Sequence, residues 1–209
     1  VGFGPAPLFW TETATTRTAT KTFNDTFDRA NGNLTGTTSS DGNFTWLDVD
    51  VGGNNWDIVS NQASAVASAG FRTCRANADL DTDDHYAQIT LASLVYSTQG
   101  AIGVLVRGTS GANGYGFEIG NVGGNVRRVY RYDTDANIAN DTTAPATTGT
   151  MYLSLDGSTY TAKLGGSTIF TGTNTLFTGQ LRTGISAYSN IAGTTLIIDN
   201  FEAADIAAG

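Results

Sequence analysis

The C-terminal segment from Met151 to Ile206 constrains the fold more than any other part of the chain. It consists of short runs in which apolar and polar residues alternate, and glycine-containing turns separate the runs. Alternation at every second residue is the pattern of a strand that rests one face on a core. Asp156-Gly157 and Gly165-Gly166 supply residues that adopt positive φ in tight hairpins. The segment therefore predicts antiparallel strands that close on a long, central strand over Thr194–Phe201. Ile197 and Phe201 should share one face of that strand, and Leu196 and Ile198 the other.

Strand patterns continue through the chain from Phe23 onward. The predicted strands there are Trp56–Val59, Gln62–Val66, Gly70–Cys74, His85–Leu94, Ala101–Arg107, Tyr115–Ile119 and Val126–Tyr132. With the C-terminal set they make about twelve strands, enough for two packed antiparallel sheets. No window carries a 3.6-residue apolar period, so almost no helix is expected. A chain of 209 residues can form one core, and we predict a single sandwich domain over residues 23–209.

The order of these elements resembles the concanavalin A-like lectin/glucanase superfamily. The elements that carry the resemblance are the strand Tyr152–Leu155, the Asp156-Gly157 hairpin, the strand Tyr160–Leu164, the turn Thr178–Gly184 and the final Asp199-Asn200-Phe201. The run DTFDRANG, residues 25–32, is similar to the opening of LamG-like domains found in tailed-phage virion proteins. The resemblance covers residues 23–206 and implies an all-β jelly-roll sandwich.

Residues 1–22 differ in character from the domain and are expected to form an extended arm. Large apolar side chains are followed there by a Thr-rich run that has high strand propensity but no apolar face. This combination is typical of an arm that pairs with a neighbouring subunit. A frayed or locally packed terminus is the alternative. We favour the arm because exposed apolar side chains are costly in water. Its partner-binding residues are Phe3, Leu8, Phe9 and Trp10.

The sequence lacks the carboxylates that a glycosidase needs. The resemblance includes glucanases, which carry Glu-x-Asp-x-x-Glu on one strand, and retaining enzymes need two carboxylates about 5–5.5 Å apart. This chain has three glutamates, Glu12, Glu118 and Glu202, which lie far apart in the sequence. The nearest look-alike, Asp48-Val49-Asp50, lacks the third acid and is typical of a solvated strand. We therefore predict no catalytic residues and no enzymatic activity.

The chain has one histidine and one cysteine. His85 could act as a general base, but no G-x-S-x-G motif accompanies it. The favoured interpretation is a surface histidine that is hydrogen-bonded to its neighbours. Cys74 is expected to be a buried, small apolar residue.

Two acidic runs are candidates for calcium binding. Asp79, Asp81 and Asp83 place oxygen ligands at alternate positions, as does the run over residues 133–137. Neither run has the Gly and the Glu that an EF-hand loop requires. Solvated turns are the alternative interpretation, and no other cofactor is implied.

Aromatic side chains are the candidates for glycan binding. Lectin-like sandwiches hold sugars with exposed rings that are flanked by polar groups. Trp46, Tyr115 and Tyr132 are the residues predicted for this role. Trp46 follows a polar loop and is expected to be exposed, whereas Trp56 lies in an alternating hairpin and is expected in the core.

Charge and targeting patterns narrow the function. A net charge of −8 and a pI near 4.4 argue against nucleic acid as a partner. No apolar run is long enough for membrane insertion, and no signal peptide is recognisable. We therefore expect synthesis in a host cytoplasm.

The sequence predicts a non-catalytic structural or surface protein of a large assembly. The favoured assembly is a tailed-phage virion, with this chain as a minor tail, fibre or head-decoration protein on the virion surface. Its arm would dock onto other virion subunits, in many copies or as a homo-oligomer, and its sandwich would bind host-surface glycan. A free, extracellular carbohydrate-binding module is the alternative, and a glycoside hydrolase fits less well.

Overall fold

The computed structural model describes residues 21–49, 56–65, 70–95, 99–111, 113–144, 147–189 and 195–207. The arm residues Phe3, Leu8, Phe9 and Trp10 lie outside these ranges, as does Asp50. Within the ranges, every regular element is a strand. They contain no helix that could cross a membrane.

The described residues form sixteen strands, and every pairing between them is antiparallel. They are β1 (Thr22–Asp25), β2 (Gly32–Asn33), β3 (Trp46–Asp48), β4 (Trp56–Val59), β5 (Gln62–Ala65), β6 (Gly70–Ala76), β7 (His85–Val95), β8 (Gln99–Gly108), β9 (Tyr115–Val122), β10 (Asn125–Arg131), β11 (Ala136–Asp141), β12 (Gly149–Asp156), β13 (Thr159–Leu164), β14 (Ser167–Thr173), β15 (Arg182–Ser189) and β16 (Thr195–Asp205).

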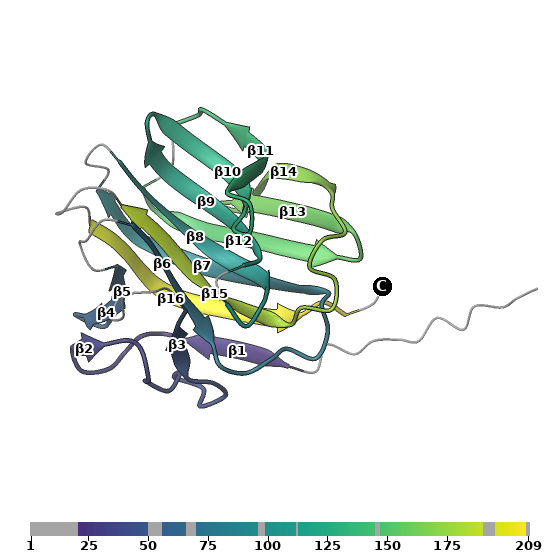
Figure 1. Cartoon of the computed structure of the whole chain (residues 1–209). Helices are drawn as coiled ribbons and strands as arrows, with labels where there is room; N and C mark the ends of the chain where they lie inside the picture. The colour runs from purple at the N-terminus through teal and green to yellow at the C-terminus, as the bar shows by residue number, and fades with distance from the viewer. Residues whose placement is uncertain are drawn as a thin grey trace, which may run out of the picture.

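The strands form two sheets. One has nine strands in the order β14-β13-β12-β7-β16-β5-β4-β2, and β1 also pairs with β16. The other has seven, in the order β11-β10-β9-β8-β15-β6-β3. The first and last strands lie side by side (Figure 1), with Thr22 opposite Ala204. The predicted all-β sandwich of two antiparallel sheets is confirmed. Strands β1, β2, β3, β11, β14 and β15 add to the strands predicted by name.

The inward-facing residues of both sheets build one core. Ile89 of β7 and Leu153 of β12 meet Val104 of β8 and Phe117 of β9, and all four are at most 1% exposed. Because side chains alternate along a strand, each of these strands contributes every second residue to the core. The Trp56 side chain is also buried, as predicted.

The expectation that Trp46 is exposed is wrong. Its side chain is fully buried, and its ring lies 5.0 Å from Phe44 and 5.1 Å from Phe201 between centroids. Its Nε1 donates a hydrogen bond of 2.6 Å to Asp25. Trp46 and Leu47 are adjacent, so they point to opposite faces of β3. The sandwich buries the larger side chain and leaves Leu47 37% exposed.

A β-bulge in β16 changes which residues face the core. The strand is long and central, as predicted, because β7 covers one edge and β5 and β1 share the other. Ile198 pairs with Leu91 and Asn200 pairs with Thr90, so Asp199 is left unmatched. The extra residue reverses the alternation. Phe201 therefore faces the core together with Leu196 and Ile198, and the predicted pairing of Ile197 with Phe201 on one face is wrong.

Candidate functional site

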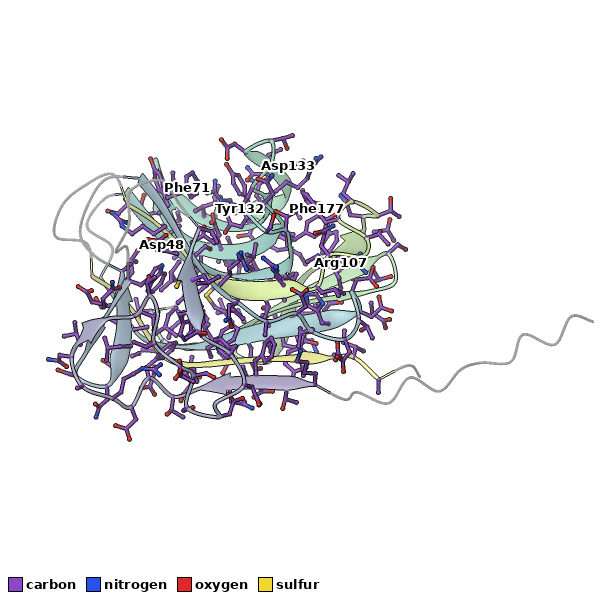
Figure 2. All side chains as sticks on the ribbon, turned by 60° about the horizontal axis from the view of Figure 1, so that its bottom comes forward. Asp48, Phe71, Arg107, Tyr132, Asp133 and Phe177 are labelled. Atoms are coloured by element: carbon purple, nitrogen blue, oxygen red, sulfur yellow. The ribbon has the colours of Figure 1, made fainter. Side chains whose placement is uncertain are left out.

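Four aromatic side chains gather on the outward face of the seven-stranded sheet. They are Phe71 of β6, Tyr130 of β10, Tyr132 directly after β10, and Tyr188 of β15, and we call them the aromatic patch. The Phe71 ring is central, at 4.8 Å from Tyr188, 6.1 Å from Tyr132 and 6.3 Å from Tyr130 between centroids. Figure 2 shows Phe71 and Tyr132 next to each other. Phe71, Tyr132 and Tyr188 are partly exposed, so the patch presents ring surface to solvent.

Strand register brings the patch together. Phe71 lies directly opposite Tyr188 in the β6–β15 pair, and both side chains therefore project from the same face. On the opposite face of β6, the side chains of Cys74 and Ala76 point inward and belong to the core. Cys74 is buried, as the sequence predicted.

A buried ion pair lies beside the rings and holds them in place. Glu118 of β9 is 0% exposed, and its Oε2 accepts a 2.8 Å hydrogen bond from Nε of Arg128. Its Oε1 accepts a 2.6 Å hydrogen bond from the Tyr132 hydroxyl, which also lies 2.6 Å from the Ser186 hydroxyl. The Arg128 guanidinium packs on the Tyr130 ring at 4.0 Å from its centroid. Burial and the neighbouring Glu118 charge raise the pKa of Tyr132 well above its usual value, so the phenol keeps its proton and donates a hydrogen bond to Glu118.

Two glycines make room for this arrangement. A Cβ on Gly116 would lie 2.4 Å from the Tyr132 hydroxyl oxygen, which is far inside van der Waals contact. A Cβ on Gly103 would lie 2.8 Å from Cγ of Glu118. Both positions need glycine so that Tyr132 and Glu118 can rest on the sheet.

The patch offers stacking surfaces and hydrogen bonds. Glu118 is the only acidic residue in the described strands β6, β8, β9, β10 and β15. Both of its oxygens accept hydrogen bonds within the protein. Asp48 of the catalytic look-alike lies on the edge strand β3, opposite Cys74. It is therefore not part of the patch.

Of the three predicted glycan-binding residues, the structure places only Tyr132 in the patch. Tyr115 is 1% exposed, because it shares the inward phase of β9 with Phe117. Its hydroxyl donates a 2.9 Å hydrogen bond to the Leu176 carbonyl, and burial raises the pKa of Tyr115 to about 12. The expectation of an exposed Tyr115 at a sugar site is thus wrong, as it is for Trp46.

The calcium candidates do not converge. Asp79 accepts a 2.8 Å hydrogen bond from Arg182, and Asp83 accepts one of 2.7 Å from the Gly179 amide. The backbone amide of Asp81 donates to Asp205. Among the described residues, no group of three or more His, Cys, Asp or Glu side chains is placed to hold a metal ion.

His85 is not on the surface, contrary to prediction. It is 0% exposed, its Nδ1 lies 2.9 Å from the Thr82 carbonyl, and its Nε2 accepts a 2.9 Å hydrogen bond from the Arg107 amide. Burial lowers the pKa of His85 to about 4, so the ring is neutral at pH 7. Both ring nitrogens are occupied, which leaves none for a base. His85 stands at every-second-residue spacing from Ala87 and Ile89, which face the core. This spacing in the sequence indicates that the His85 side chain is also buried.

Sequence reasoning missed most of the patch. Phe71, Tyr188, Glu118 and Arg128 lie on different strands, and no local motif links them. The one usable signal was the Tyr130–Tyr132 pair at the end of a predicted strand.

No protein-family model and no curated protein matches the chain by sequence. Solved structures match it in fold. The carbohydrate-binding module CBM66 from Bacillus subtilis is 13% identical with a TM-score of 0.56, over 79% of this chain and 95% of the module. The carbohydrate recognition domain of Emp47p is 13% identical with a TM-score of 0.61, over 93% and 99%. A prokaryotic β-1,3-1,4-glucanase from a mouse hindgut metagenome is 10% identical with a TM-score of 0.59, over 89% and 99%.

These likenesses establish a concanavalin A-like jelly-roll fold, which the sequence resemblance implied. At this level of identity they establish the fold alone. They include both binding domains and enzymes, so the function has to be argued from the aromatic patch.

Proposed function

We propose that the described domain is a non-catalytic carbohydrate-binding domain and that the aromatic patch is its binding surface. The observation that carries this proposal is the set of partly exposed rings of Phe71, Tyr132 and Tyr188 on one sheet face. Sugar rings have apolar C–H faces that pack on aromatic rings, and their hydroxyls bond to polar groups nearby. The hydrogen bonds of Tyr132 and the packing of Tyr130 hold these rings in position before a ligand binds.

The non-catalytic part of the proposal is supported by Glu118. A retaining glycosidase needs two carboxylates about 5–5.5 Å apart, one of which must give up a proton. Glu118 has no acidic neighbour on its own or the flanking strands, and Arg128 holds it as an ion pair. A buried, paired carboxylate is poorly suited to either role.

A glycan array probed with the full chain tests the binding surface. Phe71→Ala should weaken binding about tenfold or more, because it removes the central stacking ring. Val59→Ala is a matched control, since Val59 is an exposed apolar residue outside the patch. Equal binding by the Phe71→Ala variant and the native protein would overturn the proposal. Release of reducing ends from a bound glycan would overturn its non-catalytic part.

We further propose that the domain is displayed in many copies on a tailed-phage virion, as a minor tail, fibre or head-decoration protein attached by residues 1–22. The support is in the sequence: the apolar cluster before the Thr-rich run and the DTFDRANG opening. Antibodies against the domain should decorate purified virions in electron micrographs. A free extracellular module is the alternative, and it would leave virions unlabelled.

A further inference from the structure

The opposite face of the domain has a hollow of its own. It has a volume of about 270 Å³ and lies on the outward face of the nine-stranded sheet. Residues of β7, β16 and the β1 region line it. Three of them, Asp25, Ile89 and Phe201, have buried side chains. The others are Asn24, Thr26, Gln88, Thr90, Asn200 and Glu202. We call it the polar hollow. It lies where β16 changes its edge partner, from β5 at Ile198 to β1 at Phe201.

The polar hollow is rich in groups that can bond to hydroxyls. Glu202 is held in place, because its Oε2 accepts a 3.0 Å hydrogen bond from Gln88 and its Oε1 accepts one from the Tyr86 hydroxyl. The side chains of Asn24, Thr26 and Thr90 make no hydrogen bond within the part of the chain that the structure describes. They remain available as donors and acceptors for a ligand.

Charge and shape narrow the ligand class. The lining residues include two acids, Asp25 and Glu202, and no Lys or Arg, which disfavours phosphate and other anions. Two aromatic residues contact the lining: the Tyr86 hydroxyl bonds to Glu202, and Tyr152 lies opposite Gln88. Their rings stack with centroids 5.2 Å apart, and Lys163 lies over the Tyr152 ring at 5.0 Å. Amides, hydroxyls and a carboxylate next to aromatic rings match the alternating donors and acceptors of a neutral sugar.

We propose that the polar hollow is a second carbohydrate subsite that binds one neutral sugar residue. This subsite is separate from the aromatic patch, because it lies on the other sheet and uses none of the same residues. A domain with a sugar site on each face can bridge two glycan chains. On a multi-copy particle this would add avidity without any change in the affinity of either site.

Backbone NMR on the isotope-labelled full chain tests the subsite. The probes are the methyl glycosides of glucose, galactose and N-acetylglucosamine, each added alone. At least one should shift the amides of Thr90, Asn200 and Glu202. Thr90→Arg should abolish these shifts, because the long side chain fills the hollow from an outward-facing position. Thr168→Arg is the control, since Thr168 lies on the same face but on the edge strand β14.

The two sites are separable in the same experiment. Phe71→Ala should remove shifts at Tyr188 and leave those at Thr90 and Asn200 intact. Three outcomes overturn the subsite: no glycoside shifts these amides, Thr90→Arg leaves the shifts unchanged, or ethanolamine produces the same shifts as the glycosides. The last outcome would identify a site for ammonium groups. None of them affects the aromatic patch.

Discussion

At the scale of single residues, Asp25 ties the first strand to the aromatic core. Its carboxylate is 1% exposed and accepts hydrogen bonds from Nε1 of Trp46 at 2.6 Å and from the Phe27 amide at 2.9 Å. Arg29 pairs with the same carboxylate. One side chain therefore satisfies a buried indole, a backbone amide and a guanidinium.

Replacing Asp25 should be costly. Asp25→Ala leaves the Trp46 and Phe27 donors without an acceptor, and we expect the free energy of unfolding to fall by about 3–5 kcal/mol. Asp25→Asn keeps one acceptor oxygen and should cost less. Urea denaturation measures both, with the exposed Asp28→Ala as the control. Equal stability of Asp25→Ala and Asp28→Ala would contradict this account.

His85 should make stability depend on pH. Its pKa is about 4 in the folded protein because of burial, whereas an unfolded chain has a value near 6.5. The unfolded state therefore binds more protons between these values, so stability is complete above about pH 6.5 and falls as the pH drops toward about 4. The loss is on the order of 3 kcal/mol. Urea denaturation of the native protein and of His85→Gln from pH 7 to 4 checks this.

Because His85→Gln has no titrating ring, the difference between the two stability curves isolates His85 from the carboxylates. Parallel curves over this window would show that His85 does not titrate between the two states.

At the scale of elements, Gly116 of β9 should control the patch. Gly116→Ala places a Cβ 2.4 Å from the Tyr132 hydroxyl oxygen and must displace that ring. We expect a loss of about 1–3 kcal/mol in stability together with weaker glycan binding. Gly111→Ala is the control, because its Cβ would meet nothing closer than 3.9 Å. The two variants are compared by thermal denaturation and glycan titration. Native binding by Gly116→Ala would refute a positioning role for Tyr132.

Strand β16 should need an extra residue at position 199 in order to fold, but that residue should not need to be an aspartate. Deleting Asp199 restores plain alternation and turns Phe201 and Ala203 away from the core. We expect this variant not to fold, whereas Asp199→Ala should fold normally. Near-UV circular dichroism and amide dispersion in NMR spectra distinguish the two outcomes. A folded deletion variant would mean that β16 can shift its register.

At the scale of the whole molecule, residues 1–20 and the sandwich should have separate roles, since Thr22 already belongs to strand β1 of the sandwich. The described domain already has paired strands from Thr22 onward and a core that includes Phe23. Deleting residues 1–20 should therefore change the melting temperature little and leave glycan binding intact. Our proposal of a virion protein further predicts that the truncated chain is not incorporated into the particle, which complementation of a phage mutant measures. A truncated chain that loses several kcal/mol of stability would mean that these residues belong to the domain.

Some of the strands could be predicted because the alternation of apolar and polar residues depends only on neighbouring positions in the sequence. The hairpin at Asp156-Gly157 and the strands on both sides of it were predicted from the residues they contain. Strand β14 was not predicted, because it is an edge strand whose residues are largely exposed and carry little apolar alternation. Strand β15 was missed because its inward residues include small ones such as Ala187.

The sequence by itself determined an all-β sandwich, since residues that alternate every two positions can bury only one face of a strand. Tertiary structure decided which face. Trp46 and Leu47 point to opposite faces of β3, so only one of them can face the core. The structure buries Trp46, the larger side chain, and leaves Leu47 partly exposed. Phe71 and Tyr188 lie far apart in the chain and meet only through the register of β6 and β15. The candidate site depends on such long-range pairings, and strand periodicity carries no information about them.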